Sequence, residues 1–433
     1  MEIEYVKTLI SANTIQFIAI LYGKNTLRDF LYAVDIILNM KSLDERALAL
    51  HKEHRGKLEV QPVIPVSDKD ALSLVYTPGV AAVSTLIAKD RPASFDYTWR
   101  GRTVAVVSDG SAVLGLGNIG PEAALPVMEG KALLLKQFGG VDAVPLVINT
   151  QDPSDIIRFV THVAPSFAGI LLEDISAPRC FQIEEALEPL GIPVFHDDQH
   201  GTAIVVGAAL RNAAKVVNKR YEDLNVVIVG AGAAGLATAK MLLGLQCESD
   251  RCEVLPGSTR VNDVIVVDSS GALVPGRSGQ NVYKQAVASV SNNRRLTGTL
   301  SDVIRGTDAV IGVSGPGTIT RDMVGTMAEH AIVFAMANPI PEILPDEAKK
   351  AGALVVATGR SDLPNQINNV LAFPGVFRAV INGRLKTITP RMKQAASDAL
   401  AAIIKEPAAD RIVPDPFMPD LSAIVSDAIL RVR

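Results

Sequence analysis

The chain has 433 residues, a formal net charge of −4, and a composition that is 48% hydrophobic but only 5% aromatic. This length is enough for two or three domains with complete cores, and the dominance of aliphatic residues is typical of α/β folds whose strands are covered on both faces. Because charges of both signs are scattered along the chain, the composition indicates neither a nucleic-acid partner nor a membrane partner.

The cysteines are few for a chain of this length: Cys180, Cys247 and Cys252. They are too few for a disulfide framework, so we expect free thiols and a reducing, cytoplasmic location. A metal pair at Cys247 and Cys252 is the alternative, but no further cysteines or suitably spaced histidines join them, and we interpret both as loop thiols. The apolar segment 14–22 is shorter than the ~20 residues of a membrane span and follows acidic residues, unlike a signal peptide.

The first part of the chain predicts little chemistry. Residues 1–44 predict a helical extension, since apolar positions recur at helical spacing over 27–40, and residues 51–66 form a polar, Pro-punctuated linker. Tyr76 then precedes a turn at Pro78. Alone, Tyr76 is more simply a core aromatic than a phenol directed into a cleft.

A short buried strand at 104–107 leads into a glycine-rich loop at 115–120. This loop superficially resembles a dinucleotide loop, but its helix begins late, beyond Pro121, so the signal is weak. The amphipathic helix that follows contains Lys131, and the usual place of a helix lysine is the solvated surface.

Two acidic pairs are the most informative feature of this half: Glu173 with Asp174, and Asp197 with Asp198. Each pair directly follows an apolar stretch that predicts a buried strand. Neighbouring carboxylates repel each other and are costly to desolvate, so such pairs need a cation. Brought together at one edge of a parallel sheet, they form an all-oxygen site that suits Mg²⁺ or Mn²⁺. The alternative is two ordinary solvated loops.

The second half opens with a strand, a G-x-G-x-x-G loop and a helix in that order. Its glycines permit a tight turn and close approach of a pyrophosphate to the helix N-terminus. The next strand ends at Asp268, as expected for a group that binds the ribose hydroxyls. The distance in sequence from the glycine loop to Asp268 exceeds the usual ~20 residues, because of the polar insert 247–262, which we interpret as a surface loop. The predicted residues of the cofactor loop are Gly230, Gly232, Ala233, Ala234 and Gly235.

The alternation of strands and helices predicts parallel βαβ units throughout. Asn338 and Asn369 lie in loops after later strands, where a buried amide must bond either to backbone or to a ligand. Residues 390–433 predict two helices with a Pro-rich break at 414–419.

Taken together, these motifs resemble the malic enzyme family in its short, bacterial-type form. The resemblance runs from about residue 45 to the C-terminus. It implies an α/β fold with an N-terminal substrate and metal domain at 45–200 and a Rossmann-type, doubly wound dinucleotide-binding domain with C-terminal helices at 201–433. The matching segments are 75–81, 108–117, 128–132, 172–175, 195–203, the loop at Gly230, 337–339 and 368–370.

The resemblance implies oxidative decarboxylation of L-malate to pyruvate and CO₂ with reduction of NAD⁺ or NADP⁺. It implies that Mg²⁺ or Mn²⁺ is held by Glu173, Asp174 and Asp198. Lys131 is expected to be the base that takes the C2 hydroxyl proton, with Asp197 paired to it, and Tyr76 the acid that protonates the enol. Asn338 is expected to contact the substrate and the nicotinamide, and Asn369 the substrate.

This chain departs from the longer eukaryotic-type members, which carry an arginine in the loop that here spans 108–113. We therefore expect loop amides near Gly115 and Gly117 to bind a malate carboxylate. Asp268 favours NAD⁺, because a carboxylate repels a 2′-phosphate. NADP⁺ is the alternative, since Ser269, Ser270 and Arg277 lie nearby.

Two other functions remain open from the sequence. One is a different metal-dependent, NAD(P)-linked hydroxy-acid or amino-acid dehydrogenase, and the other is a catalytically silent NAD-binding protein. Neither explains the joint occurrence of Tyr76, Lys131 and two acidic pairs. We further expect a homodimer or a higher homo-oligomer.

Overall fold

The computed structural model describes residues 43–113, 115–248 and 251–433. It divides into two compact units, Met1–Lys57 and Leu58–Arg433. The described part of the first unit contains the helix α4 (Leu43–His54), which has no buried residue. The predicted helical extension 1–44 therefore lies almost entirely outside the described residues.

The first sheet of the second unit has four parallel strands in the order β2-β1-β3-β4. All six residues of β1 are buried, which is why this strand has a continuous apolar sequence. Asp152 caps the helix α9 (Pro153–Val163) by accepting from the amides of Ser154 and Asp155. The strands are β1 (Thr103–Ser108), β2 (Asp142–Val147), β3 (Gly169–Leu172) and β4 (Val194–His196); the helices among them are α8 (Pro121–Gly139), α9 (Pro153–Val163) and α10 (Arg179–Leu187).

The second sheet has six strands in the order β12-β11-β10-β5-β8-β9. Five are parallel and only β9 runs antiparallel, against β8. The chain order reverses between β5 and β10, and ligands of open α/β sheets bind at the carboxyl ends beside such a switch point. The strands are β5 (Asn225–Val229), β8 (Asp263–Asp268), β9 (Gly271–Ala272), β10 (Ala309–Gly312), β11 (Ala331–Ala335) and β12 (Ala353–Thr358).

Helices cover both faces of this sheet, so the predicted α/β fold with a Rossmann-type, doubly wound domain is confirmed. Along β5, Val226 and Ile228 face one core and Val227 and Val229 face the other, as the period of two in a strand requires. The first core includes α11 (Asp197–Val216) and α12 (Ala233–Leu242), and the second includes α14 (Leu300–Val303), α15 (Arg321–Gly325) and α16 (Pro345–Lys350).

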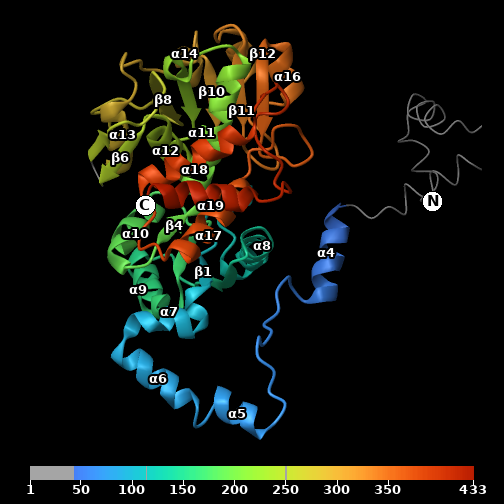
Figure 1. Cartoon of the computed structure of the whole chain (residues 1–433). Coiled ribbons are helices and arrows are strands. Elements are labelled where there is room, and N and C mark those ends of the chain that lie inside the picture. Colours follow the sequence, from blue (N-terminus) through green and yellow to red (C-terminus); the bar gives the residue numbers. More distant parts are fainter. Residues whose placement is uncertain (1–42, 114, 249–250) are drawn as a thin grey trace, which may run out of the picture. The chain divides into compact units, whose positions relative to one another are not determined.

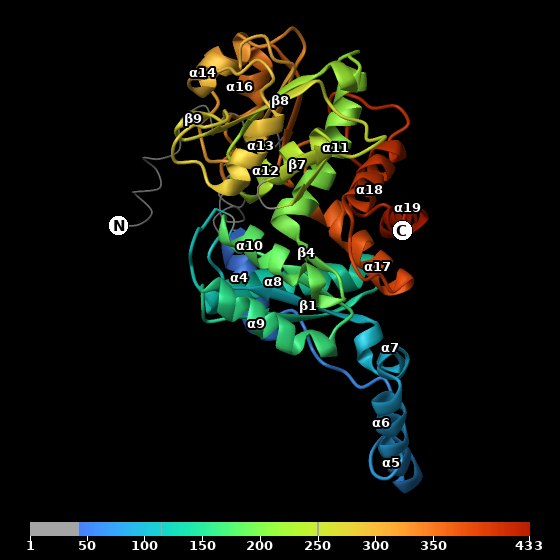
Figure 2. The ribbon, with the colours of Figure 1, turned by 90° about the vertical axis from the view of Figure 1, so that its left-hand side faces the viewer.

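Long helices lie between the two sheets (Figure 1). α11 begins directly after β4 and packs on α12 and on α18 (Pro390–Ile403), while α17 (Phe373–Gly383) packs on α8 and on α19 (Leu421–Arg431). The ring of Phe377 meets that of Phe195 edge-on, with centroids 5.9 Å apart. The last helices therefore return to cover the first sheet, although the sequence grouped them with the second; α18 and α19 are the two predicted C-terminal helices. Figure 2 shows α17, α18 and α19 from a second direction.

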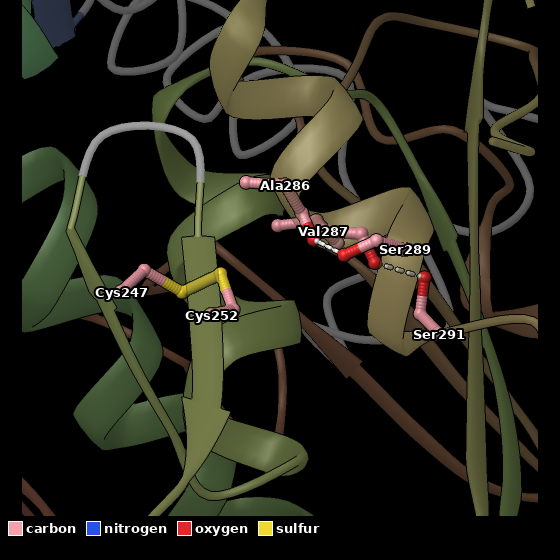
Figure 3. Close-up of a disulfide and its surroundings, with 6 residues drawn as sticks. All are labelled: Cys247, Cys252, Ala286, Val287, Ser289 and Ser291. Carbon is pink, nitrogen blue, oxygen red and sulfur yellow. Dashed lines mark hydrogen bonds between the residues drawn. A yellow bond between two sulfur atoms is a disulfide. The ribbon is translucent and has the colours of Figure 1, made fainter. Parts of the chain in front are cut away.

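The expectation of unpaired loop thiols at Cys247 and Cys252 is wrong. Part of the predicted surface loop is a hairpin of β6 (Leu245–Glu248) and β7 (Arg251–Val254), whose antiparallel register places the two cysteines directly opposite each other. They form a disulfide close to the helix α13 (Val282–Val290) (Figure 3). Hydrophobic periodicity did not reveal this register, because the strands are short. Cys180 is a buried free thiol, as expected.

One described segment, Lys69–Lys89, is long and apolar enough to cross a membrane, with a mean hydropathy of 1.6. The structure divides it at the predicted turn into α5 (Lys69–Val75) and α6 (Val80–Lys89). At 1.5 Å per residue these helices extend roughly 10 and 15 Å, whereas the hydrocarbon core is about 30 Å thick. Neither helix alone spans that distance.

The remaining described elements are short. They are η1 (Arg91–Ala93), α7 (Ser94–Tyr97), η2 (Trp99–Gly101), η3 (Ala164–Ser166), η4 (Glu188–Leu190), η5 (Tyr221–Asp223) and η6 (Asn369–Leu371).

The contact of α17 with the first sheet makes a testable prediction. Phe377 is fully buried there, so Phe377→Ala should lower the free energy of unfolding by about 3–5 kcal/mol, through lost burial and the cavity left behind. Urea denaturation followed by circular dichroism measures this loss. The matched control is Phe417→Ala, at an exposed position, which should cost much less. Equal effects of the two substitutions would contradict the packing described.

Candidate active site

Three carboxylates meet at the carboxyl edge of the first sheet. Glu173 and Asp174 follow β3, and Asp198 lies in the first turn of α11, directly after the neighbouring parallel strand β4. One oxygen from each carboxylate lies within 4.8 Å of the others. The backbone N–H of Asp174 also donates to Asp198 Oδ2 at 2.9 Å. The two acidic pairs predicted from the sequence thus come together in space.

The chemistry of this cluster fits a divalent cation. Glu173 Oε2 and Asp174 Oδ2 are buried without a hydrogen-bond partner. Burial raises the pKa of Glu173 well above its usual range despite the opposing charge of Lys131, and burial together with Asp198 raises the pKa of Asp174 to about 8. Carboxylates that are this costly to ionise alone are what a hard cation such as Mg²⁺ or Mn²⁺ would stabilise.

Lys131 projects from α8 into the same site. Its Nζ lies 2.9 Å from Glu173 Oε1 and contacts Asp197 Oδ2, and it sits 4.7 Å from the centroid of the Phe373 ring. With a side chain only 14% exposed, Lys131 is not the solvated lysine that its helix alone predicts. Burial by itself lowers the pKa of Lys131, but Asp197 and Glu173 outweigh burial and raise this pKa above its ordinary value.

Asn369 reaches this site from beyond the second sheet, at the start of η6. Its Nδ2 donates to the backbone oxygen of Asp197 at 3.3 Å and to Asp197 Oδ2 at 3.2 Å, and its Oδ1 accepts from Thr202. This approach depends on Gly201, because a Cβ there would lie 1.9 Å from Asp197 Oδ1. No local motif indicated this role for Gly201.

The first turn of α11 is held by a network that the sequence analysis missed. Glu184 on α10 accepts from His200 Nε2 at 2.8 Å, from Gln199 Nε2 at 3.0 Å and from the amide of His196 at 3.3 Å. Burial lowers the pKa of His200 to about 4, against the pull of Glu184. Since Asp197 and Asp198 lie between these donors, Glu184 helps to fix both carboxylates. Because Glu184 lies in a different helix from Asp197 and Asp198, no local sequence motif indicated this contact.

The glycine loop after β5 has the geometry that its sequence predicts. Gly230 has a φ of +117°, and a Cβ there would lie 2.5 Å from the oxygen of Val313. A Cβ at Gly235 would lie 1.8 Å from the oxygen of Gly230, so α12 packs closely on the loop. Ala233 and Ala234 open α12, and its N-cap Gly232 makes no side-chain cap. The first amides of α12 are therefore free to bind a phosphate group.

The loop at Gly115 contacts the loop that follows β11. Gly115 has a φ of +76°, and a Cβ there would lie 2.5 Å from the backbone oxygen of Asn338. Glu342 holds this second loop in place. Its side chain is fully buried and accepts hydrogen bonds from the amides of Ser314 and Ala337, at 2.9 Å each. The sequence analysis did not identify Glu342. The predicted substrate loop of the first sheet thus meets the predicted Asn338 of the second.

Asp268, at the end of β8, already has two cationic partners. Its Oδ2 lies 2.6 Å from Arg277 Nη2 and 2.7 Å from Lys284 Nζ. Burial alone would raise the pKa of Asp268, but these two hydrogen bonds lower it to about 2. Because its charge is balanced in this way, Asp268 repels a 2′-phosphate less than its sequence position indicates.

Tyr76 is the predicted site residue that the structure does not bring to this cluster. It is the C-cap of α5 and is 67% exposed. Within residues 43–113, 115–248 and 251–433, the structure records no hydrogen bond of its hydroxyl.

Comparison with known proteins identifies both halves of the chain. The family model described as "Malic enzyme, N-terminal domain" matches residues 55–188, and "Malic enzyme, NAD binding domain" matches residues 199–431. The bifunctional malic/malolactic enzyme of Bacillus subtilis (strain 168) is 50% identical over 394 residues, which cover 90% of this chain and 93% of that protein.

The NAD-dependent malic enzyme of Geobacillus stearothermophilus is 53% identical over 352 residues, covering 81% of this chain and 70% of that protein. Other relatives are named NADP-dependent malic enzymes. The crystal structure of the NAD-dependent malic enzyme from Thermotoga maritima shares 44% identity, with a TM-score of 0.83 over 89% of this chain and 98% of that one. On this agreement of sequence and fold, the chain belongs to the malic enzyme family.

Proposed function

We propose that the chain oxidatively decarboxylates L-malate to pyruvate and CO₂ with reduction of a nicotinamide dinucleotide. The observation that carries this proposal is the cluster of Glu173, Asp174 and Asp198, with Lys131 between it and Asp197. A different dehydrogenase and a silent NAD-binding protein are less well supported, because neither requires a buried cation site beside a buried lysine.

Lys131 is proposed as the base that takes the proton from the C2 hydroxyl of malate, a role that requires its neutral amine. A cation held by Glu173, Asp174 and Asp198 would offset the carboxylate charge that raises the pKa of Lys131. Its Nζ lies beside Glu173, so a hydroxyl held at the carboxylate cluster falls within hydrogen-bond reach of the lysine. Asp197 orients the side-chain nitrogen of Lys131, and Asn369 in turn fixes Asp197.

The cofactors supply the remaining chemistry: a divalent cation would draw electrons from the substrate oxygens, and NAD⁺ would accept a hydride from C2. The residues proposed to hold the cation are Glu173, Asp174 and Asp198. We propose that the substrate carboxylate and the nicotinamide end are bound by Asn338 and by the amides near Gly115 and Gly117. The close approach of Gly115 to the backbone oxygen of Asn338 supports this assignment. Tyr76 is proposed as the acid that protonates C3 of the enol.

NAD⁺ is the proposed cofactor, with the pyrophosphate at Gly230, Gly232, Ala233, Ala234 and Gly235 and the adenosine ribose at Asp268. We also infer a cytoplasmic homodimer or higher homo-oligomer with no nucleic-acid or membrane partner, which the balanced charge of the chain supports. The division at residue 200 is retained as the functional boundary, since the metal ligands precede it and the cofactor loop follows it.

A direct assay tests this function. Purified protein is mixed with L-malate and Mn²⁺, separately with NAD⁺ and NADP⁺, and the absorbance of the reduced nicotinamide is followed while pyruvate is measured independently. We expect reduction with equimolar pyruvate, abolished by EDTA and restored by excess Mn²⁺. Absence of reduction with either cofactor, from folded and metal-loaded protein, would overturn the proposal.

The metal site predicts the effect of Asp198→Asn. This change keeps the size of the side chain but removes a charged ligand, so we expect Mn²⁺ affinity to fall at least ~10-fold, as lost metal contacts typically cause. Isothermal titration calorimetry with Mn²⁺ measures this fall. The control is Asp155→Asn, an exposed carboxylate on α9, which should leave the affinity unchanged. Equal affinities for Asp198→Asn and the unaltered chain would place the metal elsewhere.

The role of Lys131 predicts that Lys131→Ala lowers kcat by roughly 10²–10⁴-fold, the usual contribution of general acid–base catalysis. NADH binding, followed by fluorescence, should change little. Lys136→Ala is a matched control, because Lys136 lies on the same helix and makes a surface ion pair with Asp142. If Lys131→Ala turns over like this control, Lys131 is not the base.

The ion pairs of Asp268 predict a change of cofactor preference. Asp268→Ser removes the carboxylate and frees Arg277 and Lys284 for a 2′-phosphate, so the kcat/KM ratio of NADP⁺ to NAD⁺ should rise ~10-fold or more, about 1.4 kcal/mol. Adding Arg277→Ala to this variant should reverse most of the gain. An unchanged ratio in Asp268→Ser would mean that another group reads the ribose.

A further inference from the structure

A cavity separate from the carboxylate cluster lies where α10, α11, α12, α18 and β6 come together. Its volume is about 510 Å³, and sites for small molecules usually measure ~300–1,000 Å³. Phe181, Met241 and Leu255 give it an apolar part. Its described lining includes none of the residues proposed to hold the metal or the nucleotide, so the reaction proposed above assigns no role to this cavity.

Two lysines line the cavity without a counterion. Lys240 comes from α12 and Lys393 from α18, and both residues are partly buried. Within the described chain, the structure records no ion pair for either lysine and no hydrogen bond of either ammonium group. The ammonium of Lys240 lies 5.9 Å from the centroid of the Phe181 ring. Partly desolvated charges of this kind are unfavourable unless a partner compensates them.

The surroundings of these lysines work against their positive charge. Burial lowers the pKa of Lys393 to about 8 although Glu184 opposes this effect, and repulsion by Lys240 lowers it further. Burial also lowers the pKa of Lys240. Two ammonium groups that repel each other in a partly desolvated cavity are the counterpart of the carboxylate cluster, and an anion would stabilise both of them.

The first turn of α18 adds to the positive potential of the cavity. This helix has 14 residues, Thr389 is its N-cap, and both Thr389 and Pro390 line the cavity. The aligned peptide groups of a helix place partial positive charge at its N-terminus, where anions bind favourably. The helix terminus and the two lysines therefore favour the same kind of ligand.

Carboxylates also line the cavity, but they leave its buried part positive. The side chain of Glu184 is engaged by His200 at 2.8 Å and by Gln199 at 3.0 Å. Glu185 and Glu188 are exposed, so water and salt screen their charges. Positive charge thus predominates where the cavity is buried, and negative charge where it meets solvent.

We propose that this cavity binds a small organic dianion, either a phosphate ester or a dicarboxylate, with its charged group at Lys240 and Lys393. The inference goes beyond the proposed function, because it assigns a second ligand site that the reaction does not use. Exposed lining residues, Lys386 and Gln246, give access from solvent. The hairpin of β6 and β7 supplies Gln246 and Cys247 to the lining, and the disulfide fixes its two strands to each other (Figure 3).

The cavity shares a wall with the first turn of α11. Gln199 and His200 line it, and both contact Glu184. Asp197 and Asp198 lie in the same turn. A ligand that packs against this wall is therefore expected to make the turn more rigid, and in this way a dianion would regulate turnover without contacting the substrate.

The test uses two probes, inorganic phosphate and glutarate. Each is titrated into the metal-free whole chain in EDTA, and isothermal titration calorimetry follows binding. We expect saturable binding of one molecule per chain for at least one probe. Phosphate binding alone would identify a phosphate ester as the ligand class, and glutarate binding alone a dicarboxylate. Binding of neither probe would overturn the inference, and this result is independent of the malate assay because neither metal nor malate is present.

Substitutions in the cavity locate the bound probe. Lys393→Gln and Lys240→Gln each remove one cationic partner, so we expect each to weaken binding ~10-fold or more, as loss of a charge-assisted hydrogen bond typically does. Lys393→Arg keeps the charge and should bind more tightly than Lys393→Gln. The matched control is Lys136→Gln, which removes a surface ion pair on α8 and should leave the affinity unchanged.

Circular dichroism checks that each variant is folded. Equal affinities in Lys240→Gln, Lys393→Gln and the unaltered chain would place the anion elsewhere, for example at the amides of the nucleotide loop, and would overturn the inference.

Hydrogen–deuterium exchange measures the connection to α11. With the probe at saturation, the amides of residues 196–203 should exchange more slowly, because the ligand stabilises the turn against local opening. The amides of α9, which contributes no residue to the described lining, should exchange at an unchanged rate. Lys393→Gln should abolish the difference at the same probe concentration. Unchanged exchange at 196–203 with the probe bound would overturn the connection to α11 and the regulatory role.

Discussion

The structure depends most on the concentration of buried negative charge at one edge of the first sheet. Glu173, Asp174, Asp197 and Asp198 lie together because two parallel strands end side by side, and each strand is followed by a carboxylate pair. Desolvation makes this arrangement unfavourable by itself. Lys131 balances part of the charge, and three of the carboxylate oxygens have no hydrogen-bond partner, which is the physical reason to infer a divalent cation there.

The same constraint explains the path of the chain between the two sheets. α11 begins at Asp197 and continues through the core to pack on α12, whose N-terminus is the nucleotide loop. Two of the carboxylates of the cluster are therefore carried by a helix that packs directly on the helix proposed to bind the pyrophosphate. Asn369 closes the arrangement from the opposite side by bonding to Asp197. α11 thus links Asp197 and Asp198 to the helix that follows the cofactor loop.

Much of this site could be predicted from the sequence, because the motifs that indicate it are short and local. The ends of strands are marked by acidic pairs after apolar runs and by glycines between a strand and a helix. The fold class followed from the alternation of strands and helices. What could not be predicted depends on contacts between distant segments: Glu184 behind α11, the cations on Asp268, and the need for Gly201 beneath Asp197. The pairing of Cys247 with Cys252 depended on a strand register that no periodicity revealed.

Tyr76 shows a different limit of both sequence and structure. Its motif relates it to catalysis, whereas its surroundings in a single chain are solvent and uncovered apolar helices. The buried cluster is assembled within one chain, since all of its carboxylates come from one sheet edge. The position of the metal ligands is therefore set by the sheet edge, whereas the role of Tyr76 as the acid stays a prediction, because nothing in the described contacts of Tyr76 connects it to the cluster.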